Sequence, residues 1–118
     1  MENLVLYKKI CKAFAIKDGY EYKDLSEIDP IEVDGIKYMA FEVEELDTTD
    51  EGKYQFGGTV YGVGEFVEET FDIKGDYLFY IEQDFTQTGS YYSYQEREFE
   101  KPYIVEQKEV IKTVWVAK

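Results

Sequence analysis

The chain has 118 residues, a formal net charge of −13 and 44% hydrophobic residues, so a single domain over residues 1–118 can bury a core without disulfides or a structural metal. It contains no histidine and one cysteine, Cys11, which excludes histidine-dependent nucleophiles, His-bearing zinc sites and intrachain disulfides. No basic-then-apolar leader stands at its start, and the longest apolar run is Tyr77–Ile81, so we expect a cytoplasmic protein without a signal peptide or membrane segment.

The negative charge is concentrated in the middle of the chain. Residues 38–100 carry sixteen acidic side chains against three basic ones, whereas residues 1–37 and 101–118 have net charges of −2 and +2. Nucleic acids and anionic membranes attract lysine and arginine, so we expect the protein to bind neither of them directly. A strongly acidic segment instead predicts a basic protein partner.

The first expected element is a helix over residues 3–16, ended by Asp18 and Gly19. Its apolar side chains recur at helical spacing, at Leu4, Tyr7, Cys11 and Phe14. Cys11 lies on this apolar face, which favours a buried thiol over a nucleophile. A short irregular or helical stretch is expected over residues 20–30.

Residues 31–38 predict a β-hairpin. Asp34-Gly35 favours a two-residue turn, because both central residues of a type I′ turn need positive φ. The resulting register pairs Val33 with Ile36 and Ile31 with Tyr38 on one face, and Glu32 with Lys37 on the other. The second strand is expected to continue to Glu44.

The remainder of the chain predicts further antiparallel strands. They are expected over residues 53–56, 59–63, 66–73, 77–82 and 103–116, with Pro102 as a break. Turns or loops are expected at residues 46–52, at Gly57-Gly58 as a turn or bulge, and at residues 74–76 and 86–90. The sum is an α+β fold in which an N-terminal helix packs on a curved antiparallel sheet of five to seven strands, over about residues 31–116.

Acidic residues at alternating strand positions are the main functional candidates. Glu42 and Glu44 are expected on one face about 7 Å apart, and Glu96, Glu98 and Glu100 alternate in the same way. Such rows resemble a phosphate backbone and suit the Lys/Arg channel of a nucleic-acid enzyme. The alternative is a solvated face that keeps strand edges from aggregating. Asp76, Glu82 and Asp84 belong to the same acidic stretch but lie outside the predicted surface.

Tyrosine is the second candidate, with twelve residues in the chain. Tyr91, Tyr92 and Tyr94, together with Tyr77 and Tyr80, are expected to gather at one edge of the sheet. Tyrosine provides a large amphipathic contact area at low entropic cost, as in protein-binding surfaces. The alternative is that these rings fill the faces of the sheet. The full predicted partner-binding set is Glu42, Glu44, Glu65, Glu68, Glu69, Asp72, Glu96, Glu98, Glu100, Tyr91, Tyr92 and Tyr94.

These features predict a small acidic non-enzymatic binding protein, in its most concrete form an inhibitor that fills the nucleic-acid site of a host enzyme. Small acidic phage anti-restriction and anti-CRISPR proteins are similar in size, charge and lack of catalytic motifs, although no motif here identifies a family.

Two other functions remain open. One is an assembly protein that forms homo-oligomers through strand edges and aromatic side chains. The other is a carbohydrate- or small-ligand-binding domain with a deep pocket lined by tyrosines, Trp115 and two carboxylates. No cofactor is expected. No metal is expected either, because residues 47–52 lack the ligand spacing of a calcium loop.

Overall fold

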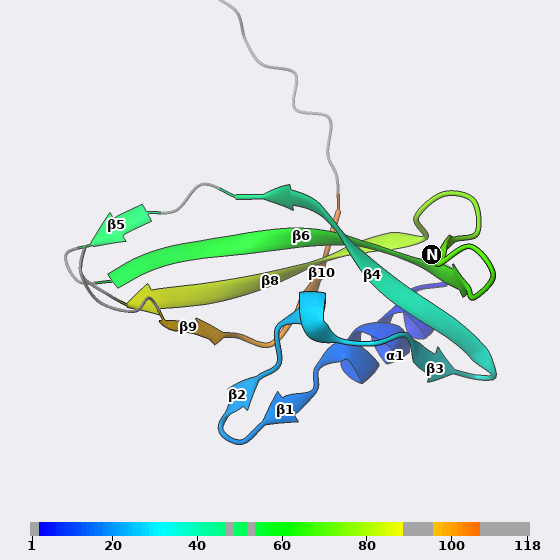
Figure 1. Ribbon diagram of the computed structural model, residues 1–118, viewed down its shortest axis with the longest axis horizontal. Coiled ribbons are helices and arrows are strands. Elements are labelled where there is room, and N and C mark those ends of the chain that lie inside the picture. Colours follow the sequence, from blue (N-terminus) through cyan, green and yellow to red (C-terminus); the bar gives the residue numbers. More distant parts are fainter. Residues whose placement is uncertain (1–2, 47–48, 52–53, 89–95, 107–118) are drawn as a thin grey trace, which may run out of the picture.

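The computed structural model describes residues 3–46, 49–51, 54–88 and 96–106 and has one α-helix packed on an antiparallel sheet (Figure 1). The elements are α1 (Leu4–Phe14), β1 (Lys17–Asp18), β2 (Glu21–Tyr22), the 3₁₀ helix η1 (Leu25–Glu27), β3 (Ile31–Val33), β4 (Ile36–Glu45), β5 (Thr49–Glu51), β6 (Tyr54–Val67), β7 (Asp72–Ile73), β8 (Phe79–Thr88), β9 (Glu96–Phe99) and β10 (Tyr103–Val105). No helix in this part of the chain is long and apolar enough to span a membrane.

The sheet is organised around a long ribbon of two strands, β6 and β8, which pair from Tyr54 with Thr88 to Val63 with Phe79. Among the described residues the strand order is β1-β2-β9-β8-β6-β4-β3, with β5 and β7 also paired to β6 and β10 to β8. Figure 1 shows β4 crossing the ribbon obliquely, with α1 under one half and β1, β2 and β9 at the other. The predicted α+β class, a helix on a curved antiparallel sheet, is confirmed.

The core lies between α1 and one face of the sheet, here called the inner face. The helix contributes its predicted apolar side, with Ile10, Cys11 and Phe14 buried. The sheet residues packed against this side are Tyr38, Ala40, Tyr61, Val63, Phe79 and Ile81. Burying each large apolar side chain contributes roughly 1.5–3 kcal/mol, so this layer is the main source of stability.

The helix ends at Phe14, two residues before the expected boundary. Asp18-Gly19 does not end it, because these residues begin the turn that joins β1 to β2, where Gly19 has a φ of 71°. The prediction located the turn signal correctly and assigned it to the wrong element.

The hairpin of β3 and β4 is confirmed in detail. Val33 pairs with Ile36, Ile31 with Tyr38 and Glu32 with Lys37. Asp34 and Gly35 have φ values of 52° and 81°, as a type I′ turn requires. The strand then continues through Glu44 to Glu45.

The sheet departs from the prediction around Gly57 and Gly58. They interrupt nothing: β6 is one continuous strand, in which Gly57 pairs with Phe85 and Gly58 with Asp84. The expected loop over residues 46–52 also contains a strand, since β5 pairs with β6. In both places a long neighbouring strand supplies backbone partners that override the local turn signal.

The next reversal of the chain also lies earlier than expected. β6 ends at Val67 and β7 pairs Ile73 with Phe66, so the chain turns between these strands rather than at residues 74–76. Phe71 adopts a φ of 52° in this turn. The expected strand over residues 66–73 is therefore wrong, because its two ends pair with each other.

The last strands follow the expected break. Pro102 lies between β9 and β10, and both strands pair with β8. The expected loop at residues 86–90 is wrong in its first part, since β8 runs to Thr88. Residues 107–116 of the expected final strand lie outside the described residues.

Two buried glutamines on the inner face of β8 differ in what they bind. Gln83 is 1% exposed, accepts a hydrogen bond from Leu25 N at 2.9 Å, and donates to Lys23 O at 3.0 Å and Glu100 O at 3.1 Å. It thereby joins the sheet to η1 and to the segment before β10. Gln87 is 7% exposed and binds side chains only, donating to Gln55 Oε1 and accepting from Arg97 Nε, both at 2.8 Å.

Candidate functional site

The face of the sheet opposite α1, here called the outer face, is set by the alternation along β8. Phe79, Ile81 and Phe85 are buried on the inner side. The residues between them, such as Glu82 and Asp84, are half-buried and point outward. Cross-strand partners share a face, so the register assigns every neighbouring residue to one side or the other.

Six carboxylates of the outer face lie along β8, β9 and the end of β4, and together they are called the outer acidic face. Its members are Glu44, Glu82, Asp84, Glu96, Glu98 and Glu100. The described residues around them on this face include no lysine or arginine. Arg97 points to the inner face, where its guanidinium lies 4.3 Å from the Phe85 ring centroid. Lys37 lies at the other end of β4 and forms an ion pair with Glu68.

Glu42 and Glu44 are separated by a β-bulge, contrary to the expectation that they share a face. Glu42 pairs with Tyr61 and Glu44 with Val60, so the register shifts between the two glutamates. Tyr61 belongs to the inner face and Val60 to the outer face, and only Glu44 joins the outer acidic face. Glu42 instead lies close enough to Tyr61 to help raise the pKa of its hydroxyl, which burial raises most.

The three glutamates of residues 96–100 come together as predicted. Glu96 and Glu98 pair with Thr88 and Thr86, on the outer side of β8. Glu100 follows through a backbone bond from its N–H to Asp84 O at 2.9 Å. It lines the same hollow as Asp84 and Thr86.

Glu82, Asp84 and Tyr103 form a compact cluster at the centre of this face. The Tyr103 hydroxyl lies 3.0 Å from Asp84 Oδ2 and is also hydrogen-bonded to Glu82. A hydrogen bond with Asp84, followed by burial, raises the pKa of Glu82 above its usual value. Burial, with these two carboxylates, also raises the pKa of Tyr103. The cluster therefore holds a proton between its oxygens more readily than isolated groups would.

The remaining predicted acids lie elsewhere. Glu65 is on the inner face opposite Tyr38, and Glu68 is neutralised by Lys37, which holds the pKa of this carboxyl below its usual range. Asp72 accepts a hydrogen bond from the neighbouring Ile73 N at 2.7 Å, near the β6–β7 turn that contains Glu69. The structure thus divides the predicted acidic set: Glu44, Glu96, Glu98 and Glu100 join the outer acidic face, Glu65, Glu68, Glu69 and Asp72 lie at the other end of the sheet, and Glu42 is on the inner face.

The predicted tyrosine cluster is described only in part. The Tyr77 and Tyr80 rings meet edge to face, with centroids 5.8 Å apart. Tyr91, Tyr92 and Tyr94 lie outside the described residues, so their place beside this pair stays a prediction.

Glu82 and Asp84 were outside the predicted surface, although the sequence contains the signal for them. From Phe79 to Phe85 one set of alternate positions is apolar apart from Gln83, and the other set contains Tyr80, Glu82 and Asp84. A period of two over this length indicates a strand with one buried face. This alternation places Glu82 and Asp84 together on the face opposite the buried side chains of Phe79, Ile81 and Phe85.

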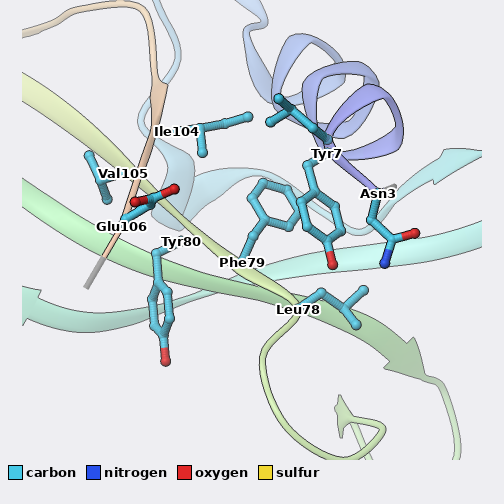
Figure 2. A pocket seen from close by; sticks show the side chains of 9 residues that line it. Asn3, Tyr7, Leu78, Phe79, Tyr80, Ile104, Val105 and Glu106 are labelled. Atoms are coloured by element: carbon cyan, nitrogen blue, oxygen red, sulfur yellow. The ribbon is translucent and has the colours of Figure 1, made fainter. Parts of the chain in front are cut away.

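An apolar groove of about 570 Å³ lies between the start of α1 and strands β8 and β10. Figure 2 shows the Tyr7 and Phe79 rings side by side within it, and their centroids are 4.5 Å apart. Leu78 and Ile104 also line the groove. Of the described residues that line it, only Glu106 carries a carboxylate. The predicted ligand pocket required two carboxylates and Trp115, which lies outside the described residues.

The one cysteine, Cys11, lies in the core. Cys11 is buried as expected; burial raises its pKa, and its thiol donates to Pro102 O at 3.6 Å. Among the described parts of the chain no group of three acidic or cysteine side chains is arranged to hold a metal ion.

No family model, no curated protein and no solved structure matches this chain.

Proposed function

We propose that this protein is a small acidic, non-enzymatic binding protein that docks its outer acidic face on a basic protein surface, such as the nucleic-acid channel of a host enzyme. The observation that carries the proposal is the gathering of six carboxylates on one face with no cation among the described residues around them. Self-repulsion on this scale costs stability unless a partner or counter-ions neutralise it.

The spacing of these charges suits a surface that recognises phosphates. Glu96 and Glu98 stand two residues apart on one strand, about 7 Å along it, and Glu100 continues this row to the level of Asp84, with Glu82 two residues further along β8. One DNA strand presents a charge about every 3.4 Å of axis. A row of carboxylates about 7 Å apart carries one charge for every two phosphate spacings, and a Lys/Arg channel would be attracted to it.

The edge of β4 argues against assembly through strand pairing. β3 pairs only with Ile36–Tyr38, and no strand of the described residues covers the same edge from Met39 to Glu45. Such an edge could extend a sheet into a second copy. It carries Glu42, Glu44 and Glu45 and is distorted by the bulge, both of which oppose edge-to-edge pairing.

The test compares two triple variants with the same change in net charge. Glu96→Lys, Glu98→Lys and Glu100→Lys reverse the exposed part of the outer acidic face. Asp29→Lys, Glu69→Lys and Asp76→Lys reverse three exposed acids elsewhere and serve as the matched control. Each immobilised protein is incubated with bacterial lysate at low salt, and bound proteins are eluted by a salt step and identified.

The proposal expects the parent and the control variant to capture a nucleic-acid-binding protein that competing DNA or RNA displaces, and the face variant to lose it. Circular dichroism and thermal unfolding verify that each variant folds. Equal capture by both variants would show that the face is not the binding surface. Salt-insensitive capture of copies of the chain itself would replace the proposal with assembly.

A further inference from the structure

A hollow of about 490 Å³ opens on the outer face where β6 and β8 pair at Gly58 and Asp84. The backbone of Gly58 lies beneath it, with the Asp84 carboxylate over that glycine. A Cβ at Gly58 would lie 2.6 Å from Asp84 Oδ1, so any side chain at this position would displace the carboxylate. The absence of a side chain therefore leaves Asp84 facing into the hollow.

The walls of the hollow differ in character. On one side are Leu46, held by a hydrogen bond from its N–H to Gly58 O at 2.9 Å, and Phe56, which is 42% exposed. On the other are Asp84 and Glu100, held side by side by the backbone bond from Glu100 N to Asp84 O. An apolar wall facing two carboxylates suits a guest with an apolar stem and a cationic end.

The inner face of the same strands already shows how this chain binds such a group. The Arg97 guanidinium lies 4.3 Å from the Phe85 ring centroid, and its Nη2 lies 3.9 Å from Glu45 Oε1. Arginine stacks on aromatic rings while donating to oxygens in its plane, and it sheds water more easily than lysine. A phenyl ring beside a carboxylate is the same pair of partners that the hollow presents outward.

We infer that the hollow anchors one arginine side chain of the basic partner. Its aliphatic stem lies on Leu46, its guanidinium stacks on Phe56, and its N–H groups donate to the carboxylates of Asp84 and Glu100. The inference rests on the proposed function and deepens it, because it distinguishes one specific anchor from general attraction to the outer acidic face. Arginines at the centre of interfaces commonly dominate binding energy.

The experiment uses hexa-arginine and hexa-lysine peptides as probes, which carry the same charge. Their dissociation constants are measured by calorimetry at low salt, with amide chemical shifts of Gly57 and Gly58 as a local readout. The parent should bind the arginine peptide about fivefold more tightly than the lysine peptide, the ratio expected from one stacked guanidinium. Phe56→Ala should remove that preference, and Glu100→Gln should weaken arginine binding.

Matched controls come from the β6–β7 turn. Phe71→Ala removes another exposed phenyl ring and Glu69→Gln another exposed carboxylate, and both should leave the preference for arginine intact. If Phe56→Ala fails to fold, Glu100→Gln against Glu69→Gln decides the question.

The outcomes separate this inference from the proposed function. Equal, salt-sensitive binding of both peptides that Phe56→Ala does not change would overturn the arginine anchor and leave the outer acidic face as a docking surface. Binding of neither peptide at low salt would overturn both.

Discussion

Replacing Gln83 by methionine tests whether a single buried amide joins the sheet to the segments that cross it. The change keeps the length of the side chain and removes its hydrogen-bonding groups. The N–H of Leu25 and the carbonyls of Lys23 and Glu100 then lose their partner. A buried donor left unsatisfied costs about 1–3 kcal/mol, and the two carbonyls, which are nearer to solvent, lose up to about 1 kcal/mol each.

The expected loss is therefore about 3 kcal/mol of unfolding free energy. A chain of this length has an unfolding entropy of about 0.25 kcal/mol/K at its midpoint, so Tm should fall by about 12 °C. Gln87→Met is the matched control, because Gln87 lies on the same face of the same strand and binds only side chains that can turn toward water. Its loss should be about 1 kcal/mol.

Both values are measurable by urea denaturation and by calorimetry on the same samples. An unchanged m-value would confirm that the variants unfold in the same way as the parent. If Gln83→Met cost no more than Gln87→Met, the three backbone bonds would not stabilise the fold, and the reasoning would be refuted.

Two further predictions concern the outer face. Since the pKa of Glu82 is raised in the folded state, its contribution to stability is present below the unfolded value of 4.5 and is lost as pH rises through the folded value. Glu82→Gln should therefore have a higher unfolding free energy than the parent at pH 7. In urea titrations this difference should disappear below about pH 4. If Glu69→Gln raised the unfolding free energy at pH 7 by the same amount, the proposed effect of Asp84 on Glu82 would be contradicted. In Gly62→Ala, the new Cβ would lie 2.5 Å from Tyr77 Cγ and push the ring away, at a cost of about 1–2 kcal/mol. Adding Tyr77→Ala should relieve that overlap, so additive losses in a double-mutant cycle would show that the overlap is not the cause.

The parts of the fold that were predictable depend on neighbours in sequence. The helix follows from the spacing of Leu4 to Phe14, and the hairpin from Asp34-Gly35 with matched side chains on both arms. These signals act over a few residues, where propensity and periodicity decide the conformation. Together, the expected helix and the expected antiparallel strands were enough to predict the α+β class of the fold.

The candidate site could not be assembled in the same way, because its geometry depends on distant pairing. The bulge between Glu42 and Glu44 exists only in the register with Tyr61 and Val60, and regular alternation predicts the wrong face for one of the two glutamates. Gly57 and Gly58 carry a turn signal that the long partner strand β8 overrides. Which acids share a face was therefore a property of the whole sheet.

The glycines of β6 have a consequence for how the chain could change in length. Gly58, Gly62 and Gly64 all have even numbers, so all lie on the outer face, where neighbouring side chains occupy the space that their Cβ atoms would fill. An insertion or deletion of one residue before Gly58 within β6 would exchange the faces of everything after it. Tyr61 and Val63 would be expelled to solvent, and three positions without side chains would face the inner side of the sheet. The strand β6 therefore tolerates no insertion or deletion of a single residue before Gly58. The turn between Val67 and Asp72, in contrast, could accommodate extra residues.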